Sequence, residues 1–302
     1  TKALTEAVDP AHLPAGGICL PVEHYGLWGG GMPKAAYLLA HAMRQLGLPV
    51  TVITLHTTPA DIAASRACGI RVVQMPWRWG HRWRLPQTAL ALTSVIDALC
   101  HPRRLLIAVG SDPLAGLLLA TPIAARLAVW ECTEATPDNP FVDRTALQRL
   151  ARALAVLAPS AAIEANIRQH HRYSGPLVRL PFWTEAEPAS SAPASPPQPP
   201  SDFLYLGRKD AKKGLYELIS ALARLERTGH PATLHLCGTG DDAPYRQFAT
   251  EQGVAHRLRC SYFAERRDVG AALRACRWLV LPSHHEGYPL TLLEAFDQGR
   301  PV

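Results

Sequence analysis

Apolar positions in the first part of the chain follow two alternating spacings. Short apolar runs predict buried strands at 17–20, 50–55, 71–74, 105–109, 127–130 and 154–157. Between these runs, apolar residues recur at intervals of three and four, as Leu38, Leu39 and Leu46 do. This spacing predicts amphipathic helices at 33–46, 60–67, 88–99, 113–126, 144–152 and 160–170. Strands that alternate with such helices form a parallel sheet covered on both faces, with ligands at the carboxyl ends of the strands.

A second set of elements follows the same alternation. Strands are predicted at 203–206, 234–236, 258–260 and 278–281, and helices at 215–228, 244–251, 267–276 and 289–298. The segment 185–200 between the two sets is rich in Pro, Ser and Ala, which favours an extended, solvated linker. The sequence therefore predicts an α/β protein of two Rossmann-like, doubly wound parallel-sheet domains, at 1–184 and 201–302.

The composition is that of a globular protein large enough for two domains. The chain has 302 residues, of which 48% are hydrophobic and 19% are charged. Its formal net charge of +6 suits anionic partners such as nucleotide diphosphates, anionic lipid headgroups or nucleic acid. The basic residues are dispersed rather than gathered in one long run, which weighs against a nucleic-acid partner.

Cysteine usage and the chain ends bear on compartment and completeness. The 7 cysteines include no C-x-x-C pair, which argues against a disulfide scaffold or a zinc ribbon and favours a reducing, cytoplasmic compartment. Neither a signal segment nor a membrane span is predicted. Because the chain begins with Thr1 and stops at a predicted strand, we expect a piece of a longer protein whose second domain is incomplete.

A glycine-rich loop precedes the first predicted helix. Gly29, Gly30 and Gly31 place their backbone at a helix N-terminus, where free N–H groups favour anions. Their spacing is not that of the dinucleotide-binding G-x-G-x-x-G motif. Two interpretations remain open: a flexible turn, or a backbone surface that approaches a phosphate.

The last predicted strand leads into a loop and a helix that carry two carboxylates. Pro289 suits the first turn of this helix, and Gly299 ends it. The helix N-terminus favours a phosphate, and Glu286 just before it is placed to accept hydroxyls of whatever the phosphate carries. Glu294 stands among apolar residues, so it either faces solvent or has a polar partner.

Two cations stand at the start of the second domain. Arg208 follows the first strand of this domain, and Lys213 precedes its first helix. Such a pair can neutralise a diphosphate leaving group as its charge develops; the alternative is a solvated basic turn. Lys209 and Lys212 are expected to face solvent. Gly238, in the turn after the next strand, allows a close approach to a phosphate or nucleoside.

Together these motifs resemble the donor site of retaining GT-B glycosyltransferases of the family 4 (group 1) type. The resemblance rests on E-G-Y-P-L-T-L-L-E at 286–294, with its flanking L-P-S and A-x-x-x-G-x-P-V, and on G-R-x4-K-G at 207–214. It implies two domains facing across a cleft and transfer of a sugar from a nucleotide-diphospho-sugar to a glycan or lipid-linked acceptor. It also implies no cofactor and no essential metal.

The resemblance assigns roles to individual residues of this chain. Arg208 and Lys213 would hold the diphosphate, Glu286 would orient the transferred sugar, and Glu294 would bind the ribose of the nucleoside. The other donor-binding residues that it implies are Gly287, Tyr288, Pro289, Leu290, Thr291, Gly238, Tyr262 and Phe263. In the first domain, the backbone of Gly30 and Gly31 would approach the donor phosphate or the acceptor.

The chain departs from the family at two strand ends of the first domain. Where family members place a His, this chain has Ser111 and Asp112 after one strand and Glu131 after the next. Glu131 is either a base toward an acceptor hydroxyl or a capped loop carboxylate. The departure keeps a second hypothesis open, namely a catalytically weak or inactive homologue that binds nucleotide sugar or acts as a scaffold.

Two further segments carry residues that suit other functions. The segment 76–86 holds three Trp and three Arg, which suit a stacked base, a peripheral contact with an anionic membrane, or a loop packed on its own domain. One such cluster is thin evidence for binding single-stranded nucleic acid. His284, His285 and Glu286 lack the helical spacing of an H-E-x-x-H site, so no metal is predicted there.

Overall fold

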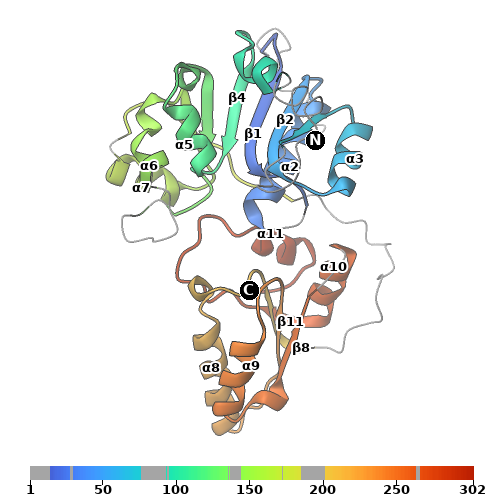
Figure 1. The fold of residues 1–302 in the computed structure, drawn as a ribbon. Coiled ribbons are helices and arrows are strands. Elements are labelled where there is room, and N and C mark those ends of the chain that lie inside the picture. Colours follow the sequence, from blue (N-terminus) through green and yellow to red (C-terminus); the bar gives the residue numbers. More distant parts are fainter. Residues whose placement is uncertain are drawn as a thin grey trace, which may run out of the picture. The chain divides into compact units, whose positions relative to one another are not determined.

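The structure is a computed structural model that describes residues 14–27, 30–75, 93, 95–134, 136, 144–171, 173–184, 201–262 and 266–302. The chain divides into two compact units, Thr1–Phe182 and Trp183–Val302, and each has its own parallel sheet (Figure 1). The Trp- and Arg-rich segment 76–86, the linker at 185–200 and Phe263 lie outside the described residues. Among the residues described, no helix is both long and apolar enough to cross a membrane.

In the described part of the first unit, seven parallel strands form a sheet in the order β3-β2-β1-β4-β5-β6-β7. They are β1 (Ile18–His24), β2 (Val50–His56), β3 (Arg71–Gln74), β4 (Leu105–Val109), β5 (Leu127–Trp130), β6 (Ala155–Ala158) and β7 (Leu177–Arg179). Six of them match the predicted apolar runs to within a few residues. The seventh, β7, was not predicted, because it is only 3 residues long and only its Leu177 and Val178 are apolar.

The helices that alternate with these strands in the sequence pack against the sheet. They are α2 (Gly31–Gln45), α3 (Pro59–Ala67), α5 (Pro113–Leu119), α6 (Arg144–Gln148) and α7 (Ala161–His171), and residues 95–100 are helical as well. Leu106 and Ala108 join a buried cluster with side chains of α5 and α7, while α2 contacts β1, β2 and β4. A single helix was predicted at 113–126, but Pro122 starts a separate 3₁₀ turn because it has no N–H to continue α5.

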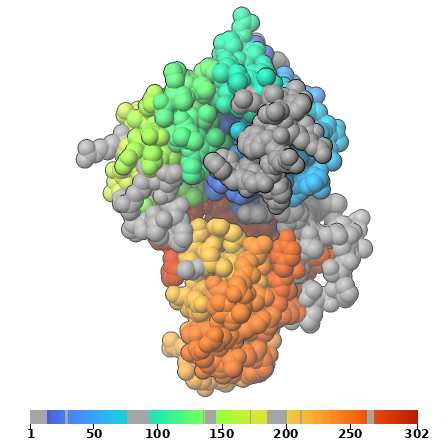
Figure 2. All heavy atoms as spheres, in the orientation of Figure 1, coloured from blue at the N-terminus to red at the C-terminus, as the bar shows by residue number. Residues whose placement is uncertain are grey.

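The second unit repeats the pattern with four described parallel strands in the order β10-β9-β8-β11. The strands are β8 (Ser201–Leu206), β9 (Leu234–Cys237), β10 (Leu258–Ser261) and β11 (Cys276–Leu279). The helices are α8 (Leu215–Arg227), α9 (Ala243–Glu251), α10 (Arg266–Ala275) and α11 (Leu290–Asp297). Tyr205 faces a core shared with α8 and α9, whereas Leu204 and Leu206 face a core shared with α10 and α11. Figure 2 shows α8 and α9 side by side in yellow and orange.

The last strand differs from its prediction. A buried strand was expected at 278–281, but β11 begins at Cys276 and its Trp278 side chain is 45% exposed. β11 is the edge strand of the described sheet, so it lacks a described neighbour on its outer side. The N–H of Leu279 nevertheless donates to the carbonyl of Pro301 at 3.0 Å, which returns the chain after α11 to this edge.

Strand order reverses once in each sheet. In the first unit the reversal lies between β1 and β4, and in the second between β8 and β11. Loops that leave the carboxyl ends of such strands diverge to opposite faces, and the crevice between them is where doubly wound folds bind ligands. In the second unit these loops are 207–214, called here the β8 loop, and 280–289, the β11 loop, and both carry predicted site residues.

Candidate functional site

The β8 and β11 loops are held against one another by backbone contacts. Gly214, at the end of the β8 loop, has φ 63°, and a Cβ there would overlap the carbonyl oxygen of Pro282. The N–H of His284 donates to the carbonyl of Lys212 at 2.8 Å. Only glycine permits both the left-handed conformation and this close approach. The sequence therefore fixes the position of one loop on the other.

Lys213 and Glu286 meet across these loops. The Nζ of Lys213 donates to Oε1 of Glu286 at 2.5 Å, although 73 positions separate the two residues. The lysine side chain is 14% exposed and the carboxylate 29%, so solvent screens the pair only in part. Two of the three residues predicted to act on the donor thus meet where the strand order of the second sheet reverses.

The third, Arg208, lies at the start of the same loop. The Tyr205 hydroxyl donates to the carbonyl of Arg208 at 2.6 Å, which anchors the backbone while the guanidinium stays exposed. Its NH2 group lies 3.6 Å from Oδ2 of Asp210. Burial lowers the pKa of Lys212, and the charges of Arg208 and Lys213 lower it further. The β8 loop is therefore a concentration of positive charge that an anion would relieve.

The turn after β9 packs on the β8 loop. Gly238 has φ 144°, and a Cβ on it would overlap the carbonyl oxygen of Gly207. Its N–H donates to the carbonyl of Ser261 at 3.0 Å. An open pocket of about 320 Å³ lies beside this turn, lined by Lys209, Gly238, Thr239, Gly240, Asp242, Ser261 and Tyr262. Gly238 and Tyr262, both predicted donor contacts, thus line one pocket.

Lys209 does not face solvent as expected. Its side chain is 2% exposed, and its Nζ pairs with Asp242 and donates to the carbonyl of Ser261 at 3.2 Å. Asp242, at the start of α9, supplies the counter-charge that makes burial of the ammonium tolerable. Lys212 is half-buried as well. The four basic residues of this loop, Arg208, Lys209, Lys212 and Lys213, therefore form a solvated surface only in part.

The remaining donor-side residues lie at the start of α11. Pro289 is its N-cap residue, Leu290 is buried in the core, and Gly287, Tyr288 and Thr291 are half-buried. Glu294 is half-buried too, on the second turn of the helix. No acidic side chain lies in the first turn, so the N–H groups there keep their affinity for an anion.

Of the three predicted glycines, Gly29 lies outside the described residues, and Gly30 and Gly31 lie at the start of α2. Gly30 is its N-cap residue, with φ 120°, and Gly31 is its first residue. A Cβ at either position would meet no atom within 4 Å. The requirement for glycine at Gly30 is therefore conformational, since an added Cβ would contact none of the described residues.

Ser111, Asp112 and Glu131 gather at the carboxyl ends of β4 and β5. Glu131 has no exposed surface and accepts hydrogen bonds from the Ser111 hydroxyl, from the N–H of Cys132 and from the N–H and hydroxyl of Thr133. This arrangement favours a capped loop carboxylate over a base that meets an acceptor. Asp112 caps α5 through the N–H of Ala115 at 2.7 Å, and burial raises its pKa to about 6.

His235 lies beneath the donor-side turns, on β9, and is almost fully buried. Arginine only donates, so the 2.8 Å contact from NH2 of Arg259 requires a neutral ring whose Nδ1 accepts. Nε2 then donates to Oγ of Ser261 at 2.5 Å. Burial, followed by the charges of Arg259 and Lys209, lowers the His235 pKa to about 4.

Because of this buried histidine, we expect the second unit to lose stability in acid. Between pH 6.5 and 4 the unfolded chain binds a proton at His235 and the folded chain does not, so stability falls as the pH falls through this window. The expected loss is about 3 kcal/mol, and His235→Gln should remove that part of the pH dependence. Urea unfolding at pH 7 and pH 4 measures it. An equal loss in both proteins would contradict the prediction.

Part of the chain is similar in sequence to known glycosyltransferases. Residues 188–302 match the family described as glycosyl transferases group 1. Over 107 residues the chain is 36% identical to the glycogen synthase of Mycobacterium tuberculosis (strain H37Rv), covering 34% of this chain and 25% of that protein. Over 100 residues it is 32% identical to the lipopolysaccharide glucosyltransferase WaaG of Escherichia coli (strain K12), covering 33% and 26%. The matched region thus spans about a quarter of the length of each relative.

Similarity at the level of structure extends over almost the whole chain. Sucrose-phosphate synthase from Thermosynechococcus elongatus superposes with a TM-score of 0.69 at 19% identity, covering 95% of this chain and 80% of that one. At this identity the likeness establishes the fold, which is the GT-B fold. The reaction that the protein catalyses is inferred from its own site residues.

Proposed function

We propose that this protein transfers a sugar from a nucleotide-diphospho-sugar with retention of configuration, a proposal supported by the match of residues 188–302 to the group 1 glycosyl transferases. One observation carries the proposal: Lys213 and Glu286 are joined across two loops at the switch point of the second sheet. This is the place where a doubly wound fold binds ligands. A cation and a hydroxyl-accepting carboxylate are the groups that a sugar diphosphate requires there.

The proposed roles follow from the charge and position of each group. Arg208 and Lys213 bind the diphosphate and stabilise the negative charge that develops as it leaves. Glu286 accepts hydroxyls of the transferred sugar, and its pairing with Lys213 holds the cation in place before the donor arrives. The backbone N–H groups at the start of α11 add a dipole directed at the same anion. Gly238 and Tyr262 take the nucleoside in the open pocket, and Glu294 binds its ribose.

The chemical step needs no further reactant. The bond between C1 of the sugar and the diphosphate oxygen breaks, and a bond from an acceptor hydroxyl to C1 forms on the same face. The hydroxyl proton passes to the leaving diphosphate, whose oxygen gains negative charge as its bond to C1 breaks. Cations that stabilise this diphosphate make it a better leaving group, and they act most strongly in the transition state.

The acceptor is proposed from the relatives. Their names are glycogen synthase and lipopolysaccharide glucosyltransferase, and glycogen is a glycan and lipopolysaccharide a lipid-linked glycan. We extend this class to the present chain. In the first unit, the exposed backbone of Gly30 and Gly31 supports a role in taking the acceptor, whereas the buried Glu131 does not serve as its base.

Sugar release from a panel of nucleotide sugars tests the proposal. Glu286→Gln keeps the shape of the side chain and removes its charge, so turnover should fall by about 100-fold, as expected when one group that contacts the reacting substrate is lost. Glu251→Gln on exposed α9 is the matched control and should change nothing. NMR of the first product formed should show the anomeric configuration of the donor. Nucleotide-sugar binding without turnover in any donor would instead support the scaffold hypothesis.

A further inference from the structure

Two histidines stand side by side at the carboxyl edge of the first sheet. His24 ends β1 and His56 ends β2, and the two are register partners in the parallel pair. Side chains of register partners point to the same side of the sheet, and neighbouring strands are about 4.8 Å apart. Their rings accordingly stack with centroids 4.6 Å apart and planes inclined by 28°. The backbone therefore sets the spacing of the two imidazoles.

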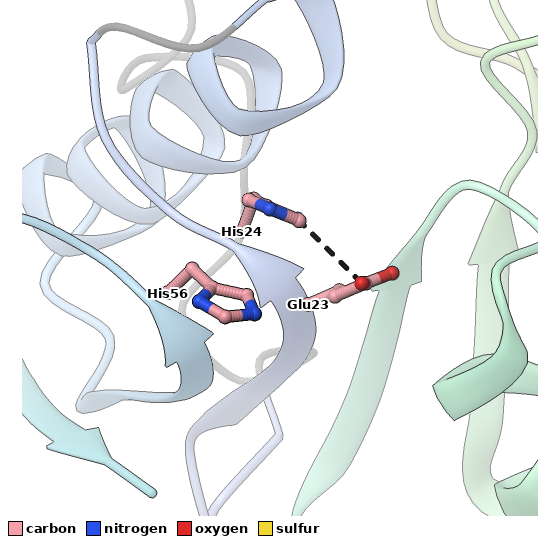
Figure 3. Close-up of side chains that lie close together, drawn as sticks. All are labelled: Glu23, His24 and His56. Carbon is pink, nitrogen blue, oxygen red and sulfur yellow. Dashed lines mark ion pairs between the residues drawn. The ribbon is translucent and has the colours of Figure 1, made fainter. Parts of the chain in front are cut away.

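Glu23 brings an oxygen ligand to the same place. Its Oε1 lies 4.0 Å from Nδ1 of His24 (Figure 3). One ligand atom from each of the three residues lies within 4.8 Å of the others. Bonds of about 2.0–2.2 Å to one ion would put two ligands at most about 4.4 Å apart, so small side-chain rotations close the set.

The strand ends that carry these ligands are fixed. The Thr54 hydroxyl donates to the carbonyls of Glu23, at 3.2 Å, and His56, at 3.0 Å. The N–H of Tyr25 donates to the carbonyl of His56 at 2.9 Å. Both imidazoles are exposed and the carboxylate is half-buried. An ion can thus enter from solvent without disturbing the sheet.

We propose that Glu23, His24 and His56 bind one divalent transition-metal cation of the Zn²⁺ class. Two imidazoles and one carboxylate suit Zn²⁺, Co²⁺, Ni²⁺ or Cu²⁺, whereas Mg²⁺ and Ca²⁺ prefer oxygen ligands alone. Three protein ligands leave a coordination position open for water or for an oxygen of a bound molecule. All three ligands come from the first unit, whereas the residues proposed to act on the donor belong to the second.

Titration of chelator-treated, reduced protein with Zn²⁺ by calorimetry tests the site. The unchanged chain should bind Zn²⁺ tightly enough to compete with a weak chelating dye, and Mg²⁺ should not displace it. His24→Ala and His56→Ala should each weaken that binding by at least about 100-fold, beyond the 10–100-fold usual for loss of an outer partner. His230→Ala, an exposed histidine of the second unit, is the matched control and should leave binding unchanged.

Exposed thiols are the competing explanation, and Co²⁺ separates the two. Cys68 and Cys100 are the exposed cysteines among those described. Co²⁺ bound at Glu23, His24 and His56 should give d–d bands without the thiolate-to-metal charge-transfer band. The double variant Cys68→Ser, Cys100→Ser should still bind Co²⁺. A charge-transfer band, loss of binding in the cysteine variants, or unchanged binding in both histidine variants would each overturn the proposal.

Discussion

Replacing Lys213 by alanine is expected to lower kcat for sugar transfer by about 100- to 1,000-fold, the usual cost of losing one group that stabilises developing charge. Its Nζ is the described cation closest to the carboxylate that we assign to the sugar, at 2.5 Å from Glu286. The loss should fall mainly on kcat, because the leaving diphosphate gains charge as the reaction proceeds. Steady-state kinetics with the best donor of the panel measures both constants.

Two further variants separate chemistry from folding in this experiment. Lys213→Ala also removes the cation that pairs with the half-buried Glu286, and an unpaired carboxylate there lowers stability. Urea unfolding is therefore measured in parallel. Lys213→Arg restores the charge with a different shape and should recover part of the rate. Arg224→Ala, an exposed cation on α8, is the control for net charge. If Lys213→Ala folded normally and kept full kcat, the assignment of Lys213 would be wrong.

Gly238→Ala is expected to destabilise the second unit by about 3 kcal/mol or more, a loss that point substitutions reach only through a few severe mechanisms. A Cβ at this position would overlap the carbonyl oxygen of Gly207, and φ 144° is a conformation that side chains rarely adopt. To relieve the overlap, the turn after β9 would have to move away from the β8 loop. Nucleotide binding should weaken together with stability.

Gly253→Ala is the matched comparison for this substitution. Gly253 also has a positive φ, 75°, but a Cβ there would meet nothing within 4 Å. It should therefore cost only the conformational strain, about 1 kcal/mol. Urea unfolding of both variants gives the difference. Equal losses would mean that the close approach of Gly238 to the β8 loop contributes nothing.

The alternation of elements, and with it the position of the β8 and β11 loops after strands, was predictable from sequence because it rests on local patterns. Apolar runs predicted six of the strands in the first sheet. That Lys213 contacts Glu286 could be inferred only through the family resemblance. Seventy-three positions separate them, and their meeting depends on the parallel order of β8 and β11.

The remaining features could not be predicted because they depend on contacts between residues far apart in the sequence, which the spacing of apolar and polar residues does not specify. Lys209 is buried because Asp242 pairs with it from another loop. Trp278 is exposed because β11 lies at the edge of the described sheet. His24 and His56 were each near a predicted strand end, and polar residues ending consecutive parallel strands were the signal that could have brought them together.

The affinity of the protein for a nucleoside diphosphate, compared with the corresponding monophosphate, tests the central claim most directly. Calorimetry with the unchanged chain and with Lys213→Ala isolates the contribution of the terminal phosphate. We expect Lys213→Ala to weaken diphosphate binding by at least about 10-fold, equivalent to 1.4 kcal/mol, with little change for the monophosphate. Equal losses for both nucleotides, or no loss for either, would contradict a diphosphate site built from the β8 and β11 loops.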